Sequence, residues 1–333
     1  MNVPRSLLIS RPDALGDAVV TTTMAGWIKQ HAPSTHITVL CKRYARAVWE
    51  HCTHVDEVLV LEELAEGGDR SAIERLAQLD ADAIVHVFPH RQVASWAKAA
   101  DIPQRIGTSH RWWHWTTCNV RVNFSRKRSN SHEALLNMQL LAPFGIPRPV
   151  SIQDLIGLSG LSAPAPSAEV HNLLARGKRT LVVHPLLGSG VGWSLQNHAE
   201  LIRSVDGSIW NVVITGTAQE AQRYAEHLPL QLPHVQDAGG KLDLTGLMML
   251  LGASDAMVAA STGPLHMAAA LGLRTIGLYS MRRPIFPARW APIGPRAHAL
   301  VHNESCTVCA AGKPCDCITR IPVATVLELL NAP

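Results

Sequence analysis

Short apolar runs alternate with longer stretches of helical periodicity along most of the chain. The apolar runs predict strands at residues 6–10, 37–40, 58–61 and 83–88, with helices predicted at 19–31, 43–51 and 72–79. The alternation then restarts, with strands predicted at 180–184, 210–214, 256–259 and 275–278, and helices at 198–205, 218–227, 242–251, 265–271 and 323–330. Strands that are apolar on both faces and are separated by helices are typical of a buried parallel sheet. The pattern therefore predicts an α/β fold with two doubly wound, Rossmann-like domains.

The interruption of this pattern predicts the domain boundary. Pro143, Pro147 and Pro149 end the first series, and residues 159–167 are rich in Pro, Ser and Ala, which suits a linker. We expect an N-terminal domain at 1–160, a linker at 161–178, a C-terminal domain at 179–322 and a closing helix at 323–333. Two such domains in tandem are expected to face each other across a ligand-binding cleft at the carboxyl ends of their strands.

Composition excludes several classes of protein. The 333 residues are 47% hydrophobic and 17% charged, which is typical of a globular chain and not of a disordered or collagen-like one. The net charge of +4 is modest and does not indicate a nucleic-acid-binding domain. No uncharged apolar run reaches the roughly 18 residues of a membrane span, and Arg5, Arg11 and Asp13 interrupt any signal-peptide core. We therefore expect a cytoplasmic protein.

The segment 11–17 (RPDALGD) joins the first predicted strand to the first predicted helix. Gly16 permits a tight turn, and Asp17 is placed at the helix N-terminus. A carboxylate there can cap backbone N–H groups, and it can also remove a proton from an acceptor hydroxyl. Both interpretations stay open for Asp17, the first candidate for a general base, with Asp13 second.

A second segment, 260–272, follows a strand with a small polar turn. Ser261, Thr262 and Gly263 present hydroxyls and N–H groups where a helix begins near Pro264, which predicts an anion site suited to a diphosphate. His266 lies in the first turn of that helix. It could donate to a phosphate oxygen, or it could be a buried core histidine.

These motifs, in this order, resemble glycosyltransferase family 9, the lipopolysaccharide heptosyltransferases. The resemblance rests on R-x-D-x-x-G-D at 11–17, on ADIPQRIG at 100–107 with the helix opening at His132, and on His184-Pro185 with residues 193–201. It continues through 240–255 into T-G-P-x-H-x-A-A-A-x-G at 262–272. Each motif alone is weak, but several in sequence and in the right structural context are specific.

The resemblance implies the GT-B architecture and a metal-independent, inverting transfer from ADP-L-glycero-D-manno-heptose to a lipopolysaccharide acceptor. Asp17 would be the general base, the C-terminal domain would bind the ADP-sugar, and no cofactor would take part in catalysis. The residues implied in donor binding are Ser189, Thr215, Gly216, Ser261, Thr262, Gly263 and His266.

Two positions depart from the family pattern. Ser261 stands where an Asp is usual, and Val191 stands where a Lys usually meets the leaving phosphate. Residues that could replace that charge are Lys178, Arg179, Lys241, Arg282 and Arg283. The departures leave open a different nucleotide-sugar donor, a protein acceptor, or a non-catalytic nucleotide-sugar-binding relative.

Residues 102–132 contain no acidic side chain but several basic and aromatic ones. Arginines can bind phosphates and tryptophans can stack on sugars or lie at a membrane interface, so we expect an anionic glycolipid acceptor and peripheral membrane association here. The candidate residues are Arg105, Arg111, Trp112, Trp113, Arg121, Arg126, Lys127 and Arg128. Nucleic-acid binding or a simple solvated loop also fits this composition. The acceptor interpretation is preferred because the family binds acceptors with its N-terminal domain, and no nucleic-acid partner is expected.

Four of the seven cysteines lie close together as C-x2-C-x5-C-x-C: Cys306, Cys309, Cys315 and Cys317. Four thiolates can surround one zinc or iron ion, which would leave no open position and make the metal structural. Similar clusters bind iron in the autotransporter heptosyltransferase branch of the family. Four reduced, unliganded thiols are the alternative. Cys41, Cys52 and Cys118 are expected in the core, and no role is assigned to the pairs His86/His90, His110/His114 and His298/His302.

Overall fold

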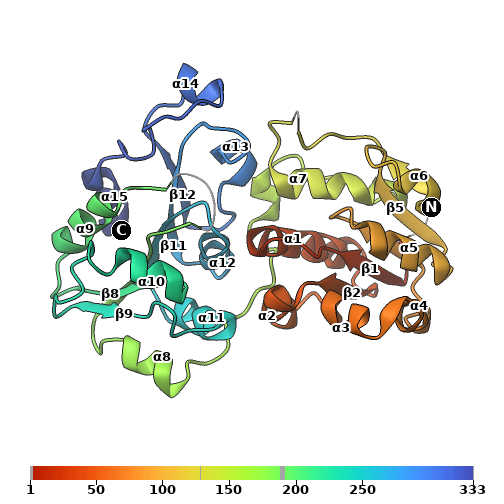
Figure 1. The fold of residues 1–333 in the computed structure, drawn as a ribbon, viewed down its shortest axis with the longest axis horizontal. Coiled ribbons are helices and arrows are strands. Elements are labelled where there is room, and N and C mark those ends of the chain that lie inside the picture. The colour runs from red at the N-terminus through yellow and green to blue at the C-terminus, as the bar shows by residue number, and fades with distance from the viewer. Residues whose placement is uncertain (1–2, 128, 188–191, 333) are drawn as a thin grey trace. The chain divides into compact units, whose positions relative to one another are not determined.

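The computed structural model describes residues 3–127, 129–187 and 192–332. The chain divides into two compact units, Met1–Ser162 and Ala163–Pro333. Each unit is a parallel sheet with helices packed against it (Figure 1). In the segment expected to be a linker, Leu161 forms a β-bridge with Cys52, and helix α8 spans Ala168–Leu173.

The sheet of the first unit has six parallel strands in the order β3-β2-β1-β4-β5-β6. Their bounds are β1 Ser6–Ser10, β2 His36–Cys41, β3 Glu57–Val60, β4 Ala83–His86, β5 Gln104–Thr108 and β6 Val120–Val122. The helices that pack beside them include α1 Leu15–His31, α2 Arg46–Glu50, α3 Leu61–Glu66, α4 Gly68–Gln78, α5 Arg91–Ala99, α6 His114–Thr117 and α7 Glu133–Met138. Leu7, Leu8 and Ile9 of β1 are all fully buried, because helices cover both faces of the sheet.

The second unit repeats this plan, with six parallel strands in the order β12-β11-β10-β7-β8-β9. Their bounds are β7 Arg179–His184, β8 Trp210–Ile214, β9 Val235–Asp237, β10 Ala256–Ala260, β11 Arg274–Tyr279 and β12 Ala297–Val301. The helices include α9 Leu195–Ser204, α10 Ala218–Tyr224, α11 Leu244–Gly252, α12 Gly263–Ala270, α13 Pro287–Trp290, α14 Thr307–Ala310 and α15 Val323–Asn331. The core includes the fully buried Leu181, Val212, Val258 and Ile276, contributed by β7, β8, β10 and β11.

Both sheets change direction of growth in the middle, which is where doubly wound folds bind ligands. In the first unit the change falls between β1 and β4, and in the second between β7 and β10. The segments that follow these strands are therefore the candidate ligand-binding segments. The first of them begins at Arg11 and another begins at Ser261.

The main differences from the sequence prediction are at element boundaries and in irregular-looking stretches. Helix α1 begins at Leu15, four residues earlier than predicted. Strands β5, β6, β9 and β12 were not predicted, because they are short or carry polar residues. His298 therefore lies in β12, and His114 lies in α6, for which no helix is predicted from the sequence.

Candidate functional site

Arg11 is the centre of a charged cluster at the carboxyl end of β1. Its side chain is only 2% exposed, and its Nε lies 2.9 Å from a carboxylate oxygen of Asp13. Its terminal nitrogen contacts the carboxylate of Asp17. Burial removes water from the guanidinium, so the charge must be paired within the protein, and the two aspartates provide that pairing.

Asp17 does not cap helix α1, which corrects one of the two interpretations of this residue. The N-cap is Ala14, whose side chain makes no capping hydrogen bond, and Asp17 lies in the first turn. Its carboxylate instead pairs with Arg11 and remains 21% exposed. Asp17 therefore presents a partly solvated carboxylate beside a buried cation.

Asp13 has an unusual proton affinity. Burial raises the pKa of its carboxyl to about 7, against the opposing effect of Arg11, and the charges of Asp17 and Glu133 raise it further. The backbone carbonyl of Asp13 also accepts a hydrogen bond from the Tyr44 hydroxyl. A carboxyl that titrates near neutral pH is suited to acid–base chemistry.

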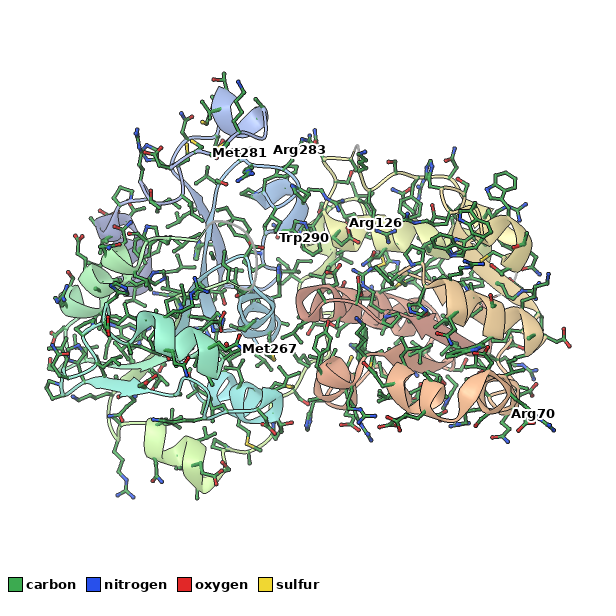
Figure 2. The ribbon with its side chains drawn as sticks, in the orientation of Figure 1. Arg70, Arg126, Met267, Met281, Arg283 and Trp290 are labelled. Carbon is green, nitrogen blue, oxygen red and sulfur yellow. The ribbon has the colours of Figure 1, made fainter. Side chains whose placement is uncertain are left out.

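Glu133, the first residue of α7, extends the cluster and was missed by the sequence analysis. It is only 3% exposed and lies 3.7 Å from Arg11 and 2.8 Å from Nε of Arg126. Arg126, labelled in Figure 2, also donates to the side chain of Asn137 at 2.9 Å. The signal that could have found Glu133 is its position beside His132, the N-cap residue of that helix.

Asn137 links α7 back to the first helix. Its amide donates to Thr21 Oγ1 at 3.2 Å, and the Thr21 hydroxyl in turn donates to the backbone carbonyl of Asp17 at 2.7 Å. The contacts from Asp17 through Arg11, Glu133, Arg126, Asn137 and Thr21 therefore form a closed circuit. Such a circuit restrains the orientation of Arg11 and, through it, of Asp17.

Two buried histidines lie at the end of β4 and in α6, which follows β5. His86 is 1% exposed and His114 is fully buried, and their rings are 5.6 Å apart. Burial lowers the pKa of His86 to about 3 and lowers that of His114, whose Nδ1 meets the carbonyl of Thr108 at 3.0 Å. Gly107 makes room for this packing, since a Cβ there would lie 2.5 Å from His114 Nδ1. Burial therefore disfavours the charged form of both rings.

In the second unit, Thr262 forms the turn between β10 and α12. Its hydroxyl caps the helix by accepting from the N–H of Leu265 at 3.3 Å, and Gly263 and Pro264 begin the helix. The first N–H groups of a helix and its dipole favour an anion at this end. His266 is 3% exposed, and its ring faces that of Trp290 at 6.1 Å.

Thr215 and Gly216 follow β8, on the other side of β7 from this turn. The Thr215 hydroxyl lies 3.0 Å from Nδ1 of His184, the last residue of β7. The carbonyl of Gly216 accepts from the N–H of Gly240, and a Cβ at Gly216 would lie 3.2 Å from Glu220 Cβ. The chain is therefore packed closely against α10 at this point, which begins with a capping box between Thr217 and Glu220.

A pocket of about 240 Å³ opens at the carboxyl ends of β10 and β11. Its lining residues are Leu187, Ala260, Ser261, Leu278, Tyr279, Ser280, Arg282, Arg283, Pro284, Ile285 and Ile318. Ser261 hydrogen-bonds the phenol of Tyr279, whose hydroxyl donates to the carbonyl of Trp290. The pocket joins the predicted anion site to the loop that follows β11.

The basic and aromatic residues of 102–132 are of two kinds. Arg105 is bound internally, donating to the carbonyls of Thr117 and Ile102, and Arg126 belongs to the Arg11 cluster. Trp112 and Trp115 are 63% and 62% exposed, and each carries an arginine over its ring: Arg91 at 4.8 Å and Arg121 at 4.7 Å.

Arg111 lies 5.6 Å from the ring of the half-buried Trp113, and Lys127 is exposed. We call Trp112, Trp115, Arg91, Arg111 and Arg121 the aromatic patch. Arg91, from α5, was missed by the sequence analysis because it lies outside the acid-free stretch.

The four cysteines of the C-terminal cluster come together. Their sulfur atoms all lie within 4.8 Å of one another, with Cys306 and Cys315 at 3.7 Å and Cys315 and Cys317 at 3.2 Å. Four sulfurs bound tetrahedrally at the usual ~2.3 Å would be separated by roughly 3.8 Å, so the arrangement fits one ion. The N–H of Cys309 points at Cys306 Sγ and is the main cause that lowers the pKa of Cys306 to about 7.

Two contacts just after Cys317 attach this cysteine cluster to the rest of the second unit. Beyond Cys317, the carbonyl of Thr319 accepts from the Asn197 side chain at 2.7 Å, and that of Ile321 accepts from the Trp193 indole at 3.0 Å. The remaining cysteines, Cys41, Cys52 and Cys118, are buried in the first unit, as expected.

Three residues named from the sequence lie outside the described residues: Arg128, Ser189 and Val191. Among the helices in the described part of the chain, none is long and apolar enough to cross a lipid bilayer.

Two doubly wound α/β units in tandem are the architecture of the GT-B class of glycosyltransferases. Residues 70–317 match the sequence profile of glycosyltransferase family 9 (heptosyltransferase), so the chain belongs to this family and is a glycosyltransferase. The fold class and the family predicted from the motifs are both confirmed.

The chain is similar to one curated protein and to solved structures. A Haemophilus influenzae protein named "Putative glycosyltransferase" is 26% identical over 300 residues, which is 86% of each chain. A glycosyltransferase family 9 structure from Veillonella parvula has a TM-score of 0.79 at 18% identity, covering 100% of this chain and 99% of its own. The E. coli ADP-heptose lps heptosyltransferase II structure has a TM-score of 0.75 at 19% identity, covering 98% and 97%.

Proposed function

We propose that this enzyme transfers a heptose from ADP-L-glycero-D-manno-heptose to a lipopolysaccharide inner-core or related anionic acceptor, with inversion. Membership of the family supports glycosyl transfer as the reaction. The similarity to the E. coli ADP-heptose lps heptosyltransferase II structure supports ADP-heptose as the donor. The observation that carries the proposal is the pair of carboxylates, Asp13 and Asp17, held by the buried Arg11 at the carboxyl end of β1.

In the proposed step, Asp17 accepts the proton of the acceptor hydroxyl. The hydroxyl oxygen forms a bond to the anomeric carbon of the donor while the bond from that carbon to the diphosphate breaks. ADP leaves with the bonding electrons, and attack opposite the leaving group inverts the anomeric centre. Arg11 pairs with Asp17 before the step, and Asp13 supplies a second group that can hold a proton near neutral pH.

The second unit would bind the donor. Ser189, Ser261, Thr262, Gly263 and His266 are proposed to hold the diphosphate, and Thr215 with Gly216 is proposed to lie by the adenine. The start of α12 supports the first assignment, since its N–H groups and dipole stabilise negative charge without a cation. No metal is required for the transfer in this proposal.

The test is transfer from ADP-heptose by the Asp17→Asn variant. We expect turnover to fall by at least a hundredfold while ADP affinity measured by calorimetry is unchanged, because a general base contributes roughly 10²–10⁴-fold. Asp80→Asn, on the surface of the same unit, is the matched control. Wild-type-like turnover in Asp17→Asn would refute the role of Asp17. Thermal shift with ADP-, GDP- and UDP-sugars tests the donor itself.

The aromatic patch is proposed to bind the anionic acceptor and the membrane surface that carries it. Exposed tryptophans partition to the lipid headgroup region, and arginines pair with phosphates. Trp113, Lys127 and Arg128 complete the proposed acceptor-binding set, whereas Arg105 and Arg126 make contacts within the unit. Flotation with phosphatidylglycerol vesicles should recover the wild-type protein and lose a Trp112→Ala/Trp115→Ala variant. The exposed Arg70→Ala is the control, and equal flotation of all three would refute membrane binding by the patch.

The cysteine cluster is proposed to hold a structural zinc or iron ion. Cys306, Cys309, Cys315 and Cys317 supply four sulfur ligands, and these are the ligands that both metals accept in closed sites. The ion would join the two halves of the segment 306–317, which contains the short helix α14. It would have no role in the transfer step.

A further inference from the structure

The pocket beside Ser261 carries a strong excess of positive charge. Arg282 and Arg283 are among its lining residues, and none of the described lining residues is acidic. Figure 2 labels Arg283 on the loop that follows β11. Ser261 and Ser280 add two hydroxyl groups to the wall. A pocket with two guanidinium groups, two hydroxyls and no carboxylate is chemically suited to a phosphate-bearing ligand.

Local geometry holds the two arginines at this edge. The Ser280 hydroxyl accepts a hydrogen bond from the N–H of Arg282 at 3.4 Å, which turns the chain directly after β11. The guanidinium carbon of Arg283 lies 5.0 Å from the centre of the Phe286 ring. Phe286 is buried, so this contact restrains an otherwise exposed side chain.

The remaining wall is apolar and strengthens the electrostatic effect. Leu187, Leu278, Ile285 and Ile318 contribute side chains from four different segments. Apolar walls exclude water, and charges interact more strongly where water is excluded. The pocket volume of about 240 Å³ leaves room for a diphosphate and part of an attached sugar but not for a whole nucleotide sugar.

The pocket is continuous with the start of helix α12. Ser261 lines the pocket, and the next two residues are the N-cap Thr262 and the first helical residue Gly263. The Thr262 hydroxyl already accepts from Leu265, so the negative charge of a ligand there would be met by backbone N–H groups and by nearby cations. Two independent features, the helix start and the paired arginines, therefore favour an anion at one place.

We propose that Arg282 and Arg283 bind the diphosphate of the nucleotide-sugar donor and stabilise its negative charge as it leaves. This inference rests on the proposed function and adds to it a pair of residues that supply the charge at the leaving group. Ser261 contributes a neutral hydroxyl to this wall, and no carboxylate among the described lining residues offsets the two guanidinium charges.

The experiment compares ADP and AMP binding by calorimetry in the full chain and in the Arg282→Ala, Arg283→Ala and double variants. We expect each single substitution to weaken ADP binding by about tenfold or more, because a hydrogen bond to a charged group contributes that much. AMP affinity should change little, so the preference for ADP over AMP should disappear in the double variant. The double Lys variant, Arg282→Lys/Arg283→Lys, should recover part of the preference.

Arg203→Ala, an exposed arginine at the end of α9, is the matched control and should bind ADP as the wild type does. Thermal unfolding of every variant checks that the second unit is folded. If the wild type binds ADP and the double variant binds it equally well, the assignment of the arginines is wrong and the proposed function stands.

If the double variant binds ADP normally but loses affinity for the ADP-sugar, the arginines face the glycosyl group and this inference is again wrong. If the wild type binds no nucleoside diphosphate, the proposed donor function fails, and the inference fails with it.

Discussion

The buried Glu133 lies 2.8 Å from Nε of Arg126 and 3.7 Å from the terminal nitrogen of Arg11, so one carboxylate contacts both arginines of the cluster. Together with Asp13 and Asp17, the cluster has three carboxyl groups and two guanidinium groups. With Asp13 protonated, the charges balance. Ionising Asp13 adds an uncompensated negative charge at a buried place, which is why its pKa is raised to about 7.

The first prediction concerns the pH dependence of transfer. The raised pKa of Asp13 means that it is protonated below pH 7 and ionised above it. Ionised Asp13 adds a negative charge beside Asp17, so we expect kcat/KM to rise with pH up to about 7 and then level off. Measuring kcat/KM from pH 5.5 to 8.5 gives the profile. In the Asp13→Asn variant, this fall of kcat/KM below pH 7 (the acid limb) should disappear. If it persists, another group is responsible for the pH dependence.

A second prediction tests Glu133 as a positioning residue. Glu133→Gln removes a negative charge that raises the pKa of Asp13, so the acid limb should move to lower pH. The substitution also weakens the contact between residue 133 and Arg11. We therefore expect kcat to fall, by roughly tenfold if one charge-assisted contact is lost.

Glu133→Asp keeps the charge and should largely keep the limb at its wild-type pH. The exposed Glu74→Gln in the same unit is the control. If Glu133→Gln lowers kcat but leaves the acid limb of kcat/KM at its wild-type pH, Glu133 acts on stability alone. Thermal unfolding of each variant separates these effects from a loss of folding.

The third prediction concerns acid stability. Burial lowers the pKa of His86 to about 3 and that of His198 to about 4, below the usual 6.5 of the unfolded chain. As pH falls below 6.5, the unfolded state gains protons that the folded state does not accept. Each histidine therefore reduces the free energy of unfolding by about 1.4 kcal/mol per pH unit until its folded pKa is reached.

Urea unfolding at pH 7.5, 6.0 and 5.0 measures this slope. His86→Asn should flatten it for the first unit and His198→Asn for the second, while the exposed His227→Asn should leave both slopes as they are. Unchanged slopes in the two buried variants would contradict the prediction.

The fourth prediction concerns the cysteine cluster. Protein purified without exposure to oxygen should contain one equivalent of zinc or iron by elemental analysis, and a strong chelator should lower the melting temperature of the second unit. Cys315→Ser should lose the metal, whereas Cys118→Ser, in the first unit, should retain it. Since the ion is proposed to be structural, transfer measured well below the lowered melting temperature should persist. Metal-free wild-type protein with the same melting temperature would favour four free thiols.

The hydrophobic pattern determined the two α/β units, because strands buried on both faces must be apolar whatever their neighbours are. Short motifs also predicted the family and the two turns that follow β1 and β10, since these depend on local spacing. Only the tertiary structure joined Arg11 to Glu133 and Arg126, which lie more than a hundred residues further along the chain. It also decided that Asp17 pairs with Arg11 and does not cap its helix, and that Arg282 and Arg283 line one pocket with Ser261. Burial and charge pairing depend on contacts distant in sequence, so no local pattern could have shown them.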